Sequence, residues 1–178
     1  QAKFGPQATV IIATYRRHRD LEACLDSLAE LDDRPDRLMV VARHEDHRSQ
    51  EIALTYGATV TPVLAPGLAA ALEAGIAAAD TEIVAFVDDD ARPHKNWLSR
   101  IKSHFREDKH LGFVGGRDNV LGDENSGSAS LSVGTIRRGK IIGNHHLGKG
   151  APRPAMHVKG ANMAFRTAAV AGLPLAAL

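Results

Sequence analysis

The chain has 178 residues, of which 44% are hydrophobic and 24% charged, and this composition is typical of one soluble globular domain with a buried core. It excludes a disordered or fibrous protein, and the apolar runs are too short to span a membrane. Cys24 is the single cysteine, which excludes a disulfide framework and a cysteine-based zinc site, and the net charge is only +1.

Apolar, β-branched runs alternate with segments of helical spacing over the first two-thirds of the chain. The predicted strands are residues 8–15, 38–42, 59–63, 82–87 and 111–115, and the predicted helices are residues 20–31, 49–56, 68–79 and 97–106. Asp20 is the expected N-cap of the first helix, and Gly57 is the expected residue after the end of the second. The alternation predicts βαβ units and a parallel sheet.

Two strands of this pattern are almost continuously apolar, which predicts helices on both faces of the sheet. They are residues 9–13 and 83–87, and the second is expected near the middle of the sheet. The fold class is therefore α/β, with three layers and a mostly parallel sheet. No linker divides the chain, so residues 1–178 are expected to form a single domain.

The last third of the chain is less regular. Residues 122–130 read as a loop, and residues 131–142 as a hairpin that turns near Arg138 and Gly139. Residues 143–156 are rich in Gly, Pro and His, which is typical of a flexible loop. A strand over residues 158–165 with a Gly-Ala-Asn bend is expected to follow.

Acidic and basic residues are separated along the chain. Every Asp and Glu lies at or before Glu124, and the 54 residues after it carry seven Lys and Arg side chains. This separation predicts an anionic ligand between a metal site and a basic lid over residues 137–153, and a basic patch without function is the alternative. Nucleic acid is not the expected partner, because the basic residues are scattered and Phe165 is the only aromatic residue among them.

The sharpest motif is a run of three carboxylates, Asp88, Asp89 and Asp90, directly after an apolar strand. Ligands of open α/β sheets bind beyond the carboxyl ends of the strands, and a cation would relieve the repulsion among three acids. Carboxylate oxygens suit Mg²⁺ or Mn²⁺, and strand alternation points Asp88 and Asp90 the same way. The alternative is a solvated acidic turn that caps the next helix.

Three stretches together resemble the nucleotide-sugar-binding portion of a family 2 glycosyltransferase with the GT-A fold, which is Rossmann-like. Residues 10–17, Val-Ile-Ile-Ala-Thr-Tyr-Arg-Arg, are similar to the opening strand and its turn. Residues 86–93, Phe-Val-Asp-Asp-Asp-Ala-Arg-Pro, with Trp97 downstream, are similar to the DXD motif. Residues 159–166, Lys-Gly-Ala-Asn-Met-Ala-Phe-Arg, are similar to the strand that leads into the acceptor region.

The resemblance implies a metal-dependent transfer from a UDP-, GDP- or dTDP-sugar to an acceptor hydroxyl, with inversion. It assigns Mn²⁺ or Mg²⁺ to Asp90 and Asp88, and it leaves open whether Glu45 or Asp46 faces the base. The residues that it assigns to the nucleotide-sugar site are Thr14, Tyr15, Arg16, Glu45, Asp46, Asp88, Asp89 and Asn162. It divides the chain into a donor part, residues 1–120, and the start of an acceptor or lid part, residues 121–178.

The sequence departs from the family pattern in three places. Ala-Arg-His-Glu-Asp at residues 42–46 stands where relatives often have Asp-Gly-Ser, and Leu-Glu at residues 72–73 stands where they often have Arg-Asn. The expected general base is missing, since no carboxylate side chain follows Glu124. The chain, which opens on Gln1, is therefore expected to be a truncated piece, to use an upstream residue, or to bind without turnover.

His145 and His146 are the candidates for a substitute base, and solvated loop residues are the alternative. Two other functions stay open: a nucleotide-sugar-binding module without turnover, and a phosphoaspartyl-type phosphotransferase. A dinucleotide-binding dehydrogenase is rejected, because the turn after the first strand has no glycine. The expected acceptor is a carbohydrate or a lipid-linked molecule. The expected location is the cytoplasm, with the inner face of a membrane as the alternative.

Overall fold

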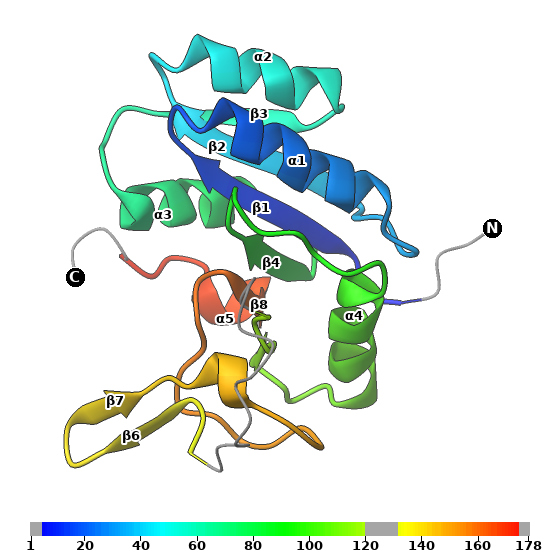
Figure 1. Cartoon of the computed structure of the whole chain (residues 1–178), viewed down its shortest axis with the longest axis vertical. Helices are drawn as coiled ribbons and strands as arrows, with labels where there is room; N and C mark the ends of the chain where they lie inside the picture. The colour runs from blue at the N-terminus through cyan, green and yellow to red at the C-terminus, as the bar shows by residue number, and fades with distance from the viewer. Residues whose placement is uncertain (1–4, 120–131, 175–178) are drawn as a thin grey trace.

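The computed structural model describes residues 5–119 and 132–174, and over these residues it forms one six-stranded sheet and a two-stranded hairpin (Figure 1). The strand order in the sheet is β3-β2-β1-β4-β8-β5, and β8 is antiparallel to both of its neighbours. The strands are β1 Ala8–Thr14, β2 Arg37–Arg43, β3 Thr59–Val63, β4 Ile83–Val87, β5 Phe113–Gly115 and β8 Asn162–Arg166. The predicted α/β class with a mostly parallel sheet is confirmed.

Helices cover both faces of the sheet, as the apolar strands predicted. One buried cluster joins Val10 and Ile12 of β1 to α1, α2 and α4, and the other joins Ile11 to α3 and α5. The helices are α1 His18–Ala29, α2 His47–Thr55, α3 Leu68–Ala78, α4 Trp97–Glu107 and α5 Thr167–Val170. All five residues of β4 are buried and β4 is the fourth of the six strands, so its predicted central place is confirmed.

Alternation of side chains along β1 explains why both faces must be covered. Gly75 of α3 packs directly over Ile11, because a Cβ at position 75 would lie 2.8 Å from the Ile11 side chain. The missing side chain lets α3 approach the sheet closely. This contact seats α3 beside the carboxyl ends of β1 and β4.

Of two predicted helix ends, one is wrong and one is confirmed. The helix α1 begins at His18 with Arg17 as its N-cap residue, so the prediction of Asp20 as N-cap is wrong. Asp20 lies inside the first turn, where its negative charge interacts favourably with the helix dipole. Gly57 has φ +71° directly after the C-cap of α2, and its predicted role is confirmed.

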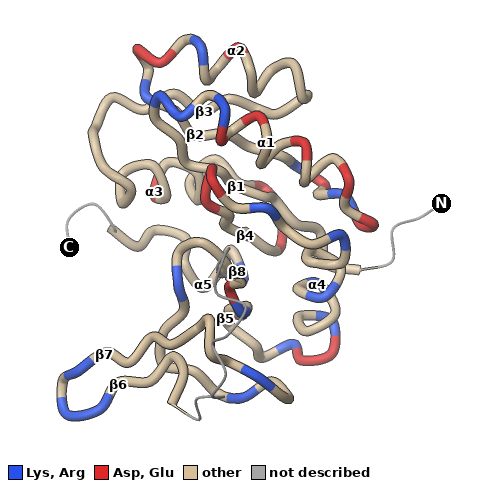
Figure 2. Tube along the Cα trace, viewed as in Figure 1, with Lys and Arg blue, Asp and Glu red and all other residues tan. Residues whose placement is uncertain are grey.

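The hairpin pairs β6, Thr135–Arg137, with β7, Lys140–Ile142, and turns at Arg138 and Gly139 as predicted. Both turn residues have positive φ, 50° and 74°, which matches the right-handed twist of a two-residue hairpin. Figure 2 shows that the Lys and Arg positions of this hairpin are at its tip, away from the six-stranded sheet. The predicted loop at residues 122–130 lies outside the described residues.

Two further segments correct the expectations for the C-terminal region. The predicted loop over residues 143–156 contains a 3₁₀ helix, His145–Leu147, and His145 in it is buried. The last strand begins at Asn162 rather than at residue 158, because the chain pairs with β4 only from Asn162 onward and with β5 only from Met163 onward. Over the described residues, every helix is too short or too polar to cross a membrane.

Candidate functional site

The predicted carboxylate cluster lies where β1 and β4 end side by side in the sheet. Thr14, the last residue of β1, donates a hydrogen bond from Oγ1 to Oδ2 of Asp89 at 2.8 Å, and both side chains are buried. Burial raises the pKa of Asp89, against the effect of this hydrogen bond. Asp89 therefore joins the two strand ends. Asp89 and Asp90 lie in a turn and share the guanidinium of Arg17, so the strand alternation that was expected to separate Asp89 from Asp90 does not continue through them.

Arg17 supplies a cation to this cluster, which the sequence analysis did not foresee. Its guanidinium lies 2.9 Å from Oδ1 of Asp89 and 2.8 Å from Oδ2 of Asp90. The hydrogen bond from Arg17 lowers the pKa of Asp90 below its usual value. The only sequence signal was its place just after the first strand, because Arg17 is 73 residues from Asp90 along the chain.

Asp88 and Asp90 have the chemistry of ligands for a hard divalent cation. Burial raises the pKa of Asp88, and the charges of Asp90 and Asp89 raise it further, so a nearby cation would be favoured. Within residues 5–119 and 132–174, no three His, Cys, Asp or Glu side chains are grouped to hold a metal ion alone. This pattern fits Mg²⁺ or Mn²⁺, which commonly take one or two carboxylates and complete their shell with water and phosphates.

Tyr15 and Arg16 continue from β1 on the exposed rim of this site. The Tyr15 ring is 45% exposed, and the guanidinium groups of Arg16 and Arg43 lie 5.0 and 5.8 Å from its centroid. Arg16 has φ +56°, a conformation that is uncommon for a residue with a side chain. Its amide donates to Oδ2 of Asp46 at 2.6 Å, which holds the turn.

Glu45 and Asp46, the two candidates for the base contact, have different surroundings. Asp46 is buried and accepts hydrogen bonds from Arg16, from His18 and from both the amide and hydroxyl of Ser49. Burial acts to raise the pKa of Asp46, but these hydrogen bonds outweigh it and lower the pKa. Glu45 is partly exposed beside Arg43 and His44, although its Oε2 is covered, so it is the more accessible of the two acids.

Asn162, assigned to the nucleotide-sugar site by resemblance, uses both ends of its amide within the protein. Its Oδ1 accepts from Nε1 of Trp97 at 2.9 Å, and its Nδ2 donates to the carbonyl of Arg117 at 3.2 Å. Gly116 makes room for this side chain, because a Cβ at position 116 would overlap the Asn162 amide. Asn162 therefore joins the start of β8 to α4 and to the segment after β5.

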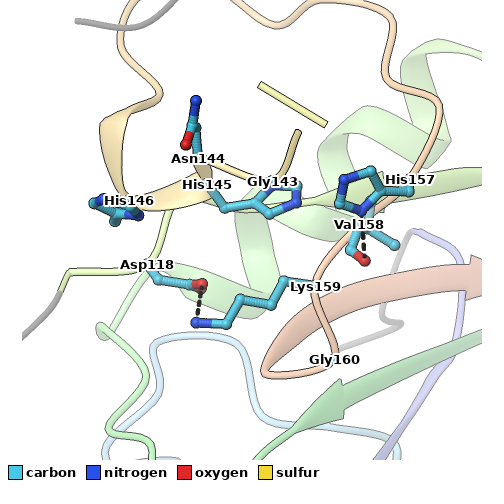
Figure 3. Close-up of a pocket in the computed structure, with 9 residues that line it drawn as sticks. All are labelled: Asp118, Gly143, Asn144, His145, His146, His157, Val158, Lys159 and Gly160. Carbon is cyan, nitrogen blue, oxygen red and sulfur yellow. Dashed lines mark hydrogen bonds and ion pairs between the residues drawn. The ribbon is translucent and has the colours of Figure 1, made fainter. Parts of the chain in front are cut away.

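A cavity of about 470 Å³ opens next to the carboxylate cluster, between the segment after β5 and the 3₁₀ helix (Figure 3). It brings together the candidate bases His145 and His146 with three side chains that sequence reasoning missed, Asp118, His157 and Lys159. Burial and the nearby His157 lower the pKa of His145. These residues are dispersed in the sequence, so only the fold could show that they share a pocket.

A smaller hollow lies on the other side of Asp88, and Gly160 lines both spaces. Leu72 of α3 lines this hollow, at a position where the resemblance had led us to expect a cation. The charge of Lys159 acts on Asp88 instead and lowers its pKa, against the stronger effect of burial. The segment predicted as a lid, residues 137–153, has two parts. Arg137, Arg138 and Lys140 lie at the tip of the hairpin, whereas the 3₁₀ helix with His145 lines the cavity.

A three-layer α/β domain with acidic residues after the carboxyl ends of β2 and β4, the parallel strands on either side of β1, has the architecture of a nucleotide-binding protein. The chain belongs to glycosyl transferase family 2, whose sequence profile matches residues 9–173. A comparison with curated protein sequences finds no significant match.

Solved structures of glycosyltransferases share this fold, which is the GT-A fold. One is glucosyl-3-phosphoglycerate synthase from Mycobacterium tuberculosis with Mn²⁺, UDP and glucosyl-3-phosphoglycerate, at TM-score 0.55 and 22% identity over 64% of this chain and 44% of that chain. Another is a mannosyltransferase from Pyrobaculum calidifontis with GDP-Man and Mn²⁺, at TM-score 0.57 and 25% identity over 66% of this chain and 37% of that chain. The matched region is thus less than half of either protein.

Proposed function

We propose that the chain is the donor-binding part of a glycosyltransferase that moves a sugar from a nucleoside diphosphate to an acceptor hydroxyl. The observation that carries the proposal is the Asp88, Asp89 and Asp90 triplet at the carboxyl end of a buried central strand in a family 2 chain. Structures of similar fold contain UDP or GDP-Man together with Mn²⁺, which supports a UDP- or GDP-sugar donor, and a dTDP-sugar is the third candidate.

The residues divide the work of binding the donor by their exposure. Tyr15 and Arg16 offer a ring and a cation to the base, and Glu45 accepts from it in preference to the buried Asp46. Thr14 holds the Asp89 carboxylate through a hydrogen bond, and Asp89 is the acid directed toward the ribose and diphosphate. Asp88 and Asp90 would hold Mn²⁺ or Mg²⁺, and the bound ion would offset the charge that develops on the leaving diphosphate.

In the transfer itself, an acceptor oxygen forms a bond to the anomeric carbon while the bond to the β-phosphate oxygen breaks, and the configuration inverts. The acceptor hydroxyl loses its proton to a base, a contribution of about 10²–10⁴ in rate. His145 is suited to this role, because burial lowers its pKa and leaves a neutral imidazole at pH 7. His146 and Asp118 line the same cavity and are the further proton acceptors there.

A donor-binding module without turnover is the second candidate function. The observation that favours it is the absence of any carboxylate side chain from residues 125–178. Separate assays of donor binding, donor hydrolysis and sugar transfer distinguish it from an enzyme. The phosphoaspartyl alternative has less support, because the acidic triplet follows β4 and not the first strand.

Calorimetric titration with UDP, GDP and dTDP, each with and without Mn²⁺, tests the proposed donor site. We expect one nucleotide to bind in a Mn²⁺-dependent manner, and Asp90→Ala to weaken it by at least about 100-fold, since lesser changes around metal ligands already cost ~10–100-fold. The melting temperature of Asp90→Ala should stay close to wild type, because an exposed ion pair such as that of Asp90 with Arg17 contributes little to folding. Asp80→Ala, which removes another exposed carboxylate that is paired with an arginine, Arg37, is the matched control.

Mn²⁺-independent binding, or equal binding by Asp90→Ala and wild type, would contradict the proposed metal site. If Asp90→Ala unfolds and the wild type binds neither Mn²⁺ nor Mg²⁺, the triplet has a structural role.

A further inference from the structure

The cavity beside the donor site has a position and a chemistry of its own. Gly160 lines both this cavity and the hollow next to Asp88, and the charges of Lys159 and Asp118 both act on Asp88. A molecule in the cavity would therefore lie directly beside the proposed metal and diphosphate. This is the place for the molecule that receives the sugar, so the inference rests on the proposed function.

Hydrogen-bond donors and potential cations dominate the lining of the cavity. Among the described lining residues, Lys159 and three histidines face one acid, Asp118. Figure 3 shows the rings of His145 and His157 above the ion pair of Asp118 and Lys159, whose charged atoms lie 3.1 Å apart. Lys159 is 56% exposed, so its ammonium group has room for a second partner.

Two buried polar atoms in the lining have no hydrogen-bond partner within the described residues, and one of them, Oδ2 of Asp118, is ion-paired with Lys159, so a single atom is left with neither. It is Nε2 of His145, whose residue is only 6% exposed. A buried ring nitrogen without a hydrogen bond costs free energy, and a ligand oxygen would relieve that cost. With its proton on Nε2, the neutral imidazole is a donor aimed at such an oxygen.

The surrounding contacts hold these groups in place before any ligand binds. The rings of His145 and His157 meet edge to face at 5.0 Å between centroids, and Nε of Arg117 donates to the carbonyl of His146 at 3.1 Å. Gly134 is required behind the rings, because it has φ +59° and a Cβ there would lie 2.7 Å from the carbonyl of His157. The cavity is therefore pre-organised, which lowers the entropic cost of binding.

We infer that this cavity binds the negatively charged group, a phosphate or a carboxylate, of a small hydroxylated acceptor. Lys159 provides the cation and Nε2 of His145 a hydrogen bond, and with His145 bound to the anion the proton of the acceptor hydroxyl passes to His146. Asp118 balances Lys159 when no acceptor is bound. The acceptor hydroxyl is then directed toward the Asp88 side of the cavity. The donor site is acidic and the acceptor site basic, as the uneven distribution of charge along the chain indicates.

The sharpest test compares variants of Lys159 and Asp118, because the inference predicts opposite effects of the two on the affinity for phosphate. The histidine ring signals of the chain are followed by NMR during titration with inorganic phosphate, and separately with acetate, at constant ionic strength. We expect saturable shifts of His145 and His157. Lys159→Gln should weaken phosphate binding by about 5-fold or more and Asp118→Asn should strengthen it, because charged hydrogen bonds are worth ~1.5–3 kcal/mol.

Two lysine variants control for folding and for general charge. Lys159→Arg keeps the cation and should restore binding, and Lys140→Gln removes an exposed lysine of the hairpin and should leave binding unchanged. Tighter binding of phosphate than of acetate identifies a phosphorylated acceptor, and the reverse order a carboxylic acid.

The inference is overturned if the ring signals do not shift, if both members of the ion pair weaken binding equally, or if Lys140→Gln acts like Lys159→Gln. Its failure is distinguishable from failure of the proposed function, because nucleotide binding with Mn²⁺ is measured by calorimetry at the other site. Phosphate binding without any nucleotide binding would retain the anion site and remove the glycosyltransferase.

Discussion

The six-stranded sheet with its helices and the segment of residues 132–161 are held together by different forces. In the sheet part, β1 and β4 are almost wholly buried, and they pair with each other in parallel. In the later region, the hairpin strands are mostly exposed, and polar contacts such as that between Arg117 and His146 connect the segments. The comparison teaches that the apolar part fixes the position of the acidic site, while polar contacts shape the basic cavity.

Removal of core atoms should separate the two regions most strongly. Leu25→Ala, in the 1% exposed core of α1, should lower the free energy of unfolding by about 2–5 kcal/mol. Ile141→Ala in β7, where the side chain is 64% exposed, should change it by less than about 0.5 kcal/mol. Urea unfolding followed by circular dichroism measures both, and similar losses would show that the hairpin is part of the cooperative core.

A buried carboxylate should link the stability of the sheet part to pH. The folded-state pKa of Asp46 is lowered, so its charged form stabilises the fold above its ordinary value of ~3.9, and this is lost as the pH falls through the folded pKa. Asp46→Asn should therefore cost about 1 kcal/mol at pH 7, and its deficit should shrink toward pH 3. Urea unfolding at both values measures the difference, and a deficit independent of pH would contradict the assignment.

The smallest expected effect concerns the cation that the sheet part supplies to its own acids. Arg17 and a divalent ion would share Asp90, so Arg17→Gln should raise the affinity of the free chain for Mn²⁺ by about 2–5-fold, as expected for an exposed ion pair. Electron paramagnetic resonance of free Mn²⁺ measures this directly. Arg19→Gln removes the same charge two residues away and should have a weaker effect, and equal effects would mean that only the overall charge matters.

The sequence by itself determined the layers and the place of the acidic triplet. Apolar alternation marks β1 to β4 and their helices, since each βαβ unit is local in sequence, and a strand end fixes where Asp88 to Asp90 lie. The same local logic predicted the hairpin turn at Arg138 and Gly139, whose residues need positive φ.

Only the tertiary structure decided which distant side chains share the site. The antiparallel insertion of β8 between β4 and β5 brings Lys159 to Asp118 and fixes Asn162 between Trp97 and Arg117. Arg17 reaches Asp90 across 73 residues, and His145 is buried although its segment has the composition of a loop. Hydrogen bonds and ion pairs of this kind have no periodicity in the sequence, because they depend on where the packed strands bring separate segments together.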